Sequence, residues 1–135
     1  MERANKQFKK RNAILECLQA TDRHPSADMV YSMLQTDHPD ISLATVYRNL
    51  SRFRSQGVIQ CVATVRGTER FDANTNPHVH FICSNCDEVL DLHQIQVPTE
   101  LSRTAEATSG CVVDDCQLTF TGLCKKCRQV RDSVS

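Results

Sequence analysis

The chain has 135 residues, in which 16 lysines and arginines balance 16 aspartates and glutamates. This length allows one ordinary domain or two small ones, because domains usually contain roughly 100–200 residues. A hydrophobic share of 40% and a charged share of 24% exclude a disordered tail and a collagen-like chain. No stretch approaches the ~18 apolar residues of a membrane span, and the basic N-terminus leads into no signal-peptide core. We therefore expect a soluble, cytoplasmic protein with no membrane partner.

The zero net charge hides an asymmetry between the two halves of the chain. Residues 1–72 contain 11 basic and 8 acidic side chains, a balance of +3, whereas residues 73–135 contain 5 and 8, a balance of −3. A basic first half joined to an acidic second half indicates two modules with different partners.

Three helices are predicted at the start of the chain. Apolar side chains recur at helical spacing over about residues 6–20. Ser26 is expected to cap a second helix, and Ser42 a third that ends at Gly57.

A β-rich run at residues 58–65 follows, and residues 69–72 are expected to pair back onto it. Three helices and a hairpin in this order are typical of a winged helix-turn-helix, which we place at residues 1–72. Residues 73–79 begin with a turn-rich stretch where the charge balance reverses, so we expect a hinge there.

The second half is predicted to be mixed α/β. A short hairpin is expected to join residues 80–82 to residues 89–92, followed by a helix at residues 98–108. Apolar and polar side chains alternate over residues 111–121, which predicts a strand with Cys116 on its inward face. A polar tail follows. The whole chain is therefore expected to have an α+β fold.

Eight cysteines are many for this length, and four of them form two C-x-x-C pairs, Cys83 with Cys86 and Cys124 with Cys127. Each pair can present two sulfurs to one tetrahedral zinc ion, which would connect both ends of a domain too small to rely on its core. One alternative is a redox dithiol, but this requires a thioredoxin-like βαβ setting that the predicted elements lack. Two ordinary thiol pairs are the other alternative.

Three histidines and two aspartates form a second candidate set: His24, Asp72, His78, His80 and Asp91. Such a mixed nitrogen and oxygen set suits Fe(II), Mn(II) or Zn(II) better than copper or an iron–sulfur cluster. Taken singly, each of these residues is more often a helix cap or a solvated side chain. An ion held by all five would fix one module against the other.

The third helix is a candidate for reading DNA, because small and polar side chains lie near its N-terminus, where a recognition helix meets base edges. Arg11 of the first helix could contact backbone phosphates. The alternative is a solvated amphipathic helix with no DNA partner. The expected contacts are Ser42, Ala44, Thr45, Tyr47, Arg48, Asn49 and Arg11.

Six motifs in chain order resemble the ferric uptake regulator (Fur) family of metal-dependent bacterial repressors. They are residues 24–28 (HPSAD), 38–39 (HP), 41–50 (ISLATVYRNL), 70–72 (RFD), the H-x-H-x-x-C-x-x-C run of residues 78–86, and G-x-C-x-x-C at residues 122–127. The resemblance extends over nearly the whole chain, from about Arg11 to Cys127.

The resemblance implies a DNA-binding domain at residues 1–72, a hinge at 73–79 and an α/β dimerisation domain at 80–135. It implies a transcriptional repressor rather than an enzyme, acting as a homodimer on a palindromic double-stranded DNA operator. It also implies structural Zn(II) at the four paired cysteines and a regulatory Fe(II) or Mn(II) ion. The implied regulatory ligands are His24, Asp72, His78, His80 and Asp91.

The aspartates at positions 72 and 91 resemble the peroxide-sensing PerR branch, since iron-sensing members tend to carry glutamate there. In that branch peroxide reacts with bound Fe(II), and oxygen is added to a ligand histidine, by position His24 or His78, which releases DNA. An iron- or zinc-status sensor of the same family is the alternative. A zinc-stabilised thiol oxidoreductase or adaptor is the alternative from another class.

Overall fold

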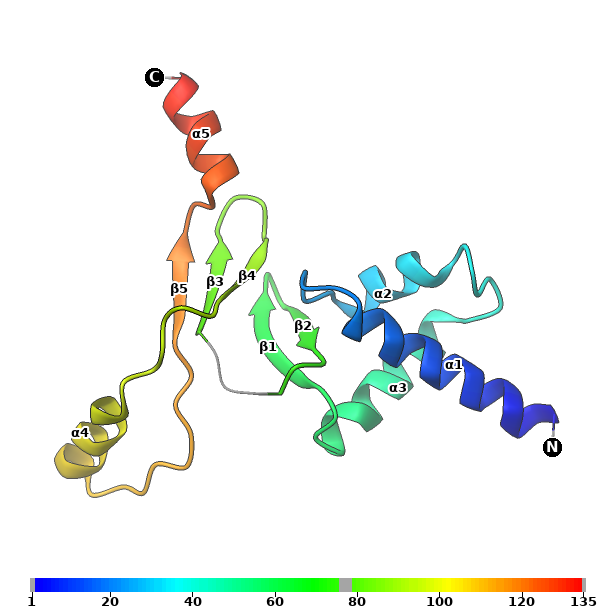
Figure 1. Ribbon diagram of the computed structural model, residues 1–135, viewed down its shortest axis with the longest axis horizontal. Helices are drawn as coiled ribbons and strands as arrows, with labels where there is room; N and C mark the ends of the chain where they lie inside the picture. The colour runs from blue at the N-terminus through cyan, green and yellow to red at the C-terminus, as the bar shows by residue number, and fades with distance from the viewer. Residues whose placement is uncertain (1, 76–78, 135) are drawn as a thin grey trace. The chain divides into compact units, whose positions relative to one another are not determined.

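Figure 1 shows the computed structural model, which describes residues 2–75 and 79–134. The chain divides into an N-terminal unit, Met1–Thr75, and a C-terminal unit, Asn76–Ser135. The expected ligand His78 lies outside the described residues. Among the described helices, none combines the length and the hydropathy that a membrane span requires.

The N-terminal unit has the predicted order of three helices and a hairpin. Its elements are α1 (Glu2–Gln19), α2 (Ala27–Leu34), α3 (Leu43–Ser55), β1 (Gln60–Val65) and β2 (Thr68–Asp72). Both predicted caps are confirmed. The Ser26 hydroxyl accepts the Met29 N–H at 3.2 Å, and the Ser42 hydroxyl accepts the Thr45 N–H at 3.2 Å. α1 begins earlier than the sequence pattern predicts.

The two strands form an antiparallel hairpin whose tight turn contains Arg66 and Gly67. Both residues have positive φ, 51° and 80°, which matches the right-handed twist of the flanking strands. The register shifts between Cys61 and Ala63, so the strand is irregular at that point. This hairpin brings Asp72, at the end of β2, back beside the helices.

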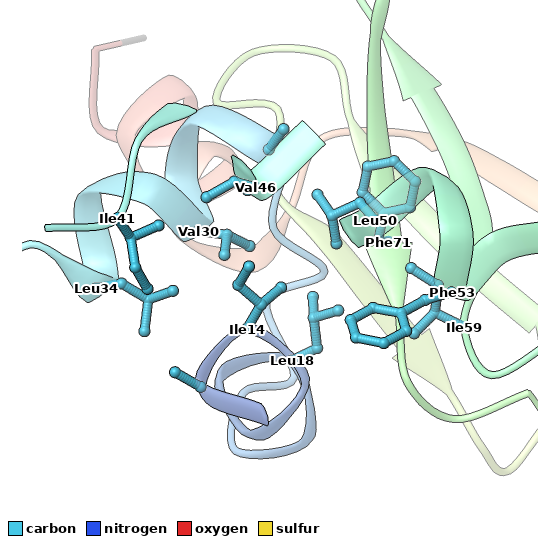
Figure 2. Close-up of a cluster of buried hydrophobic side chains, with 12 residues drawn as sticks. Ile14, Leu18, Val30, Leu34, Ile41, Val46, Leu50, Phe53, Ile59 and Phe71 are labelled. Atoms are coloured by element: carbon cyan, nitrogen blue, oxygen red, sulfur yellow. The ribbon is translucent and has the colours of Figure 1, made fainter. Parts of the chain in front are cut away.

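One hydrophobic core holds the N-terminal unit together (Figure 2). Ile14 and Leu18 of α1 point toward Val30 of α2 and Leu50 of α3, and all four are almost completely buried. The hairpin joins this core through Phe71. The helical spacing of these side chains gives each helix one apolar face, and burying these faces together fixes the orientation of α3.

The C-terminal unit contains a three-stranded sheet and two helices. Its elements are β3 (Val79–Cys83), β4 (Val89–Leu92), α4 (Thr99–Ser109), β5 (Thr119–Gly122) and α5 (Lys125–Val134). The strand order is β4-β3-β5, with β3 antiparallel to β4 and parallel to β5. The helix α4 ends at Gly110, which has the left-handed conformation expected of a C-terminal glycine.

Two expectations for the C-terminal unit are wrong. The predicted strand at residues 111–121 is reduced to β5, because the neighbouring aspartates Asp114 and Asp115 disfavour a strand. As a result Cys116 is half-buried rather than a core residue. The predicted polar tail is instead the helix α5, which contains neither glycine nor proline and carries an Arg128–Asp132 ion pair at i, i+4.

Candidate metal centres

The two C-x-x-C pairs meet in the C-terminal unit. Because β3 and β5 are parallel, Cys83 lies opposite Gly122, and Cys124 follows just beyond that glycine. The four sulfur atoms of Cys83, Cys86, Cys124 and Cys127 lie within 4.8 Å of one another.

The spacing of these sulfurs fits zinc. The Cys86 and Cys124 Sγ atoms are 3.8 Å apart. Four sulfurs placed tetrahedrally at about 2.3 Å from a zinc ion would also be about 3.8 Å from one another. The structure therefore brings together four donors with the chemistry and spacing of a structural zinc site.

Backbone N–H groups stabilise negative charge on this cluster. The N–H groups of Cys124 and Cys86 donate to Cys83 Sγ at 3.4 and 3.5 Å and lower the pKa of Cys83 to about 6. For Cys86, a backbone hydrogen bond from Glu88 lowers the pKa, but burial and the neighbouring thiols together raise it to about 12. Cys86 can therefore act as a thiolate at neutral pH only beside a cation, and a bound Zn²⁺ ion would supply that positive charge.

Asn85 also contacts the four-cysteine cluster, and it was not among the residues predicted from the sequence. Its side-chain Nδ2 donates to Cys127 Sγ at 3.3 Å. In the sequence, only the position of Asn85 inside the first C-x-x-C could have indicated this hydrogen bond, because the partner sulfur lies 42 residues further along the chain.

The second candidate set is divided between the two units, and each unit contributes a histidine–aspartate pair. In the N-terminal unit, His24 Nδ1 lies 3.4 Å from Asp72 Oδ2. Both residues are buried, with exposed fractions of 1% and 6%. The remaining oxygen of Asp72 accepts the Asn74 N–H at 2.9 Å, which fixes the carboxylate orientation.

In the C-terminal unit, His80 and Asp91 are direct cross-strand partners in the β3–β4 pair. His80 Nε2 lies 3.1 Å from Asp91 Oδ1. His93 Nε2 lies 3.6 Å from the other carboxylate oxygen, so an exposed histidine borders this pair. His93 is not among the ligands predicted from the sequence.

Each pair offers one imidazole nitrogen and one carboxylate oxygen to a metal ion. These donors suit Fe(II), Mn(II) and Zn(II). Two protein ligands are fewer than the three or four that catalytic and structural sites for such ions normally use. Neither pair alone therefore provides a complete ligand set for such an ion.

The exposed side of α3 carries the expected DNA contacts. Ser42, Ala44, Tyr47 and Arg48 are exposed, and Thr45 and Asn49 are half-buried. Within the helix, the Arg48 side chain donates to Thr45 Oγ1 at 3.3 Å and the Asn49 amide donates to the Thr45 carbonyl at 2.8 Å.

A groove of about 430 Å³ runs between α1 and this side of α3. Its lining includes the four basic side chains Lys10, Arg11, Arg48 and Arg52. The Arg11 guanidinium lies over the Phe53 ring, 5.1 Å from the ring centre, which orients it beside the core. This concentration of positive charge is suited to a phosphate backbone.

Known proteins resemble the chain over most of its length. A model of the Ferric uptake regulator family matches residues 2–121. A Staphylococcus saprophyticus protein described as the peroxide-responsive repressor PerR is 36% identical over 118 residues, which cover 87% of this chain and 79% of that protein.

Two solved structures share the fold. The structure of the Campylobacter jejuni peroxide stress regulator has a TM-score of 0.75 and 27% sequence identity, and the match covers 93% of this chain and 94% of the regulator's chain. That of the ferric uptake regulator from Francisella tularensis with iron has a TM-score of 0.75 and 27% identity, covering 88% and 91%. The family match ends before Cys124, so the second cysteine pair is assigned by its geometry.

Proposed function

Because the chain belongs to the Ferric uptake regulator family, we propose that it is a metal-dependent transcriptional repressor that senses peroxide. Members of this family bind DNA and are dimeric. The observation that carries the proposal is the presence of one histidine–aspartate pair in each unit, in a chain 36% identical to a peroxide-responsive repressor. The relatives are named as regulators, which places the chain among regulators rather than enzymes.

The proposed domains are a winged-helix DNA-binding domain at residues 1–72, a hinge at 73–79 and a dimerisation domain at 80–135. Structural zinc is assigned to Cys83, Cys86, Cys124 and Cys127 on the spacing of their sulfurs. Large apolar side chains support dimerisation of the C-terminal unit, since they are 43–82% exposed in the single chain and a second copy would cover them. They are Ile95, Leu101, Val112 and Phe120.

The regulatory ion is proposed to be Fe(II) or Mn(II), shared by the two histidine–aspartate pairs. The His24–Asp72 pair supplies two ligands and the His80–Asp91 pair two more. His78 is proposed as the fifth, since it precedes His80 by two residues. Neither pair is sufficient alone, so this ion binds tightly only when the two units are brought together.

Metal binding is thereby coupled to DNA binding. A palindromic operator requires the two recognition helices of a dimer to be separated by about 34 Å, one helical turn of DNA. Without the ion, the hinge allows many separations. An ion that binds only one arrangement of the two units increases the population of that arrangement. The apparent DNA affinity then rises, at most by the ratio of the ion's affinities for this arrangement and for the others.

The proposed DNA contacts lie on α3 and in the basic groove beside it. Exposure of Tyr47 and Arg48 and the position of Arg11 in the groove support this assignment. Because the partner is genomic DNA, we also propose that the protein is cytoplasmic. The contact set is Ser42, Ala44, Thr45, Tyr47, Arg48, Asn49 and Arg11.

Peroxide sensing would use the same ligands. When bound, Fe(II) supplies the electron-transfer chemistry that activates peroxide. In the net reaction, one peroxide oxygen is added to a carbon of a ligand imidazole, His24 or His78, and the other leaves as water. The oxidised ring is a weaker ligand, so the units lose their connection and DNA is released. Mn(II) would support DNA binding without this reaction.

The test is peroxide treatment of the Fe(II)-loaded and Mn(II)-loaded protein, followed by peptide mass spectrometry and operator binding. We expect one added oxygen on His24 or His78 and loss of operator binding with Fe(II) only. Metal-dependent operator binding without histidine oxidation would instead indicate an iron- or zinc-status sensor.

A variant pair checks the ligand set. His78→Ala is expected to retain zinc and fold but to lose operator binding. His38→Ala, a histidine outside the proposed ligand set, is the control and should behave as wild type.

A further inference from the structure

Two consecutive residues of β2 hold the loop that carries His24. The buried guanidinium of Arg70 donates through Nε to the His24 carbonyl and through Nη2 to the Arg23 carbonyl, the latter at 2.8 Å. The next residue, Phe71, donates its backbone N–H to the Pro25 carbonyl at 3.0 Å. Three consecutive loop carbonyls are thus fixed by one strand.

This loop requires such support. His24 has a φ of 51°, in the left-handed region that non-glycine residues rarely occupy, yet its side chain is only 1% exposed. A backbone conformation of this kind persists only where the surroundings hold it. The hydrogen bonds from Arg70 are made to the carbonyl of this residue and to that of its predecessor.

The same strand also carries the partner ligand. Residues 70 and 72 are two apart in β2, so both side chains lie on one face. On that face Arg70 binds the loop backbone, and Asp72 Oδ2 lies 3.4 Å from His24 Nδ1. Arg70 thus contacts the backbone of His24 from the same face of β2 on which Asp72 lies beside the His24 side chain.

We infer that Arg70 is a positioning residue for the regulatory metal: it fixes His24 opposite Asp72 and so prepares this pair before the ion binds. This inference rests on the proposed function, in which that pair ligates the ion. The fork of the guanidinium is essential, because two N–H groups in fixed geometry reach two adjacent carbonyls. Lysine keeps the charge but carries its donors on one flexible, compact head.

The experiment measures Mn(II) affinity of the zinc-loaded full chain, from the electron paramagnetic resonance signal of free Mn(II). The variants are Arg70→Lys, His24→Gly and the double variant, since glycine adopts the positive φ without strain. Arg66→Lys is the matched control, an exposed arginine in the turn of the same hairpin. Zinc content and thermal unfolding are measured for each variant.

We expect Arg70→Lys to weaken Mn(II) binding about 10–100-fold, the usual effect of losing an outer-shell partner, while Arg66→Lys has no effect. In the His24→Gly background, Arg70→Lys should weaken Mn(II) binding by less than about twofold more, because the ligand that Arg70 positions is already absent. Zinc content should remain unchanged in every variant.

Unchanged Mn(II) affinity in Arg70→Lys overturns the inference, as does an equal loss in both backgrounds, which would indicate a general structural effect. If His24→Gly itself leaves Mn(II) affinity unchanged, the proposed ligand set is wrong, and so is the inference that depends on it. Should Arg70→Lys fail to fold, Arg70→Gln, which retains two N–H donors, replaces it alone and together with His24→Gly, and the same outcomes decide.

Discussion

Replacing Cys124 by serine should unfold the C-terminal unit and leave the N-terminal unit folded. Among the described residues of the C-terminal unit, the buried apolar side chains are Val79, Cys83, Val89 and Cys124. Two of these four are members of the sulfur cluster, and no residue of α4 is buried. By contrast, the N-terminal unit has a continuous core built from every one of its helices.

The magnitudes favour zinc as the main source of stability in the C-terminal unit. Burying two valine side chains contributes about 3–6 kcal/mol. Binding of a structural zinc ion contributes about 10–16 kcal/mol at neutral pH. Loss of one thiolate ligand should therefore remove more stability than the apolar core of this unit can replace.

The assay combines zinc analysis, sedimentation and calorimetry of Cys124→Ser. We expect no bound zinc, no dimer and a single remaining unfolding transition, that of the N-terminal unit. Cys116→Ser is the matched control, because Cys116 is a half-buried cysteine outside the cluster, and it should retain zinc and both transitions. A folded, dimeric Cys124→Ser protein would refute the reasoning.

Three further predictions concern the cluster, the core and the DNA surface. Because the pKa of Cys83 is lowered to about 6, its thiolate persists at neutral pH in the zinc-free protein and is protonated as the pH falls through that value. The zinc affinity, measured by competition with a chelator, should therefore fall more steeply with pH below about pH 6 than above it, and an unchanged slope between pH 7 and pH 5 would contradict this. Leu50→Ala, at a side chain only 1% exposed, should destabilise the N-terminal unit by about 2–5 kcal/mol in urea unfolding; a loss below 1 kcal/mol would count against the packing described. Arg48→Ala should weaken operator binding by about 1–3 kcal/mol in a fluorescence titration, whereas Arg103→Ala on α4 should have no effect; equal losses would disprove a specific role for α3.

The N-terminal unit could be predicted in detail because its signals are local. Ser26 and Ser42 cap their helices through a backbone N–H three residues away, and the apolar faces follow from helical spacing. The C-x-x-C pairs were identifiable for the same reason. Their meeting depends on the parallel pairing of β3 with β5, which the sequence analysis did not predict.

The missed features depend on contacts distant in the sequence. The bonds from Arg70 reach carbonyls 46 and 47 residues earlier in the chain, so no local pattern indicates them. The strand predicted at residues 111–121 was too long, because the alternating apolar residues were given more weight than Asp114 and Asp115, and only the pairing with β3 shows where β5 begins.

The sulfur cluster also changes what a cut in the chain would do. Its two cysteine pairs lie on either side of α4 and of the irregular, mostly exposed residues 111–118, where a protease would most readily cleave. After such a cut, both fragments would still be held by the same ion and by the β3–β5 hydrogen bonds. A nicked protein should therefore migrate as one species on a native gel and separate into two fragments once a chelator removes the metal.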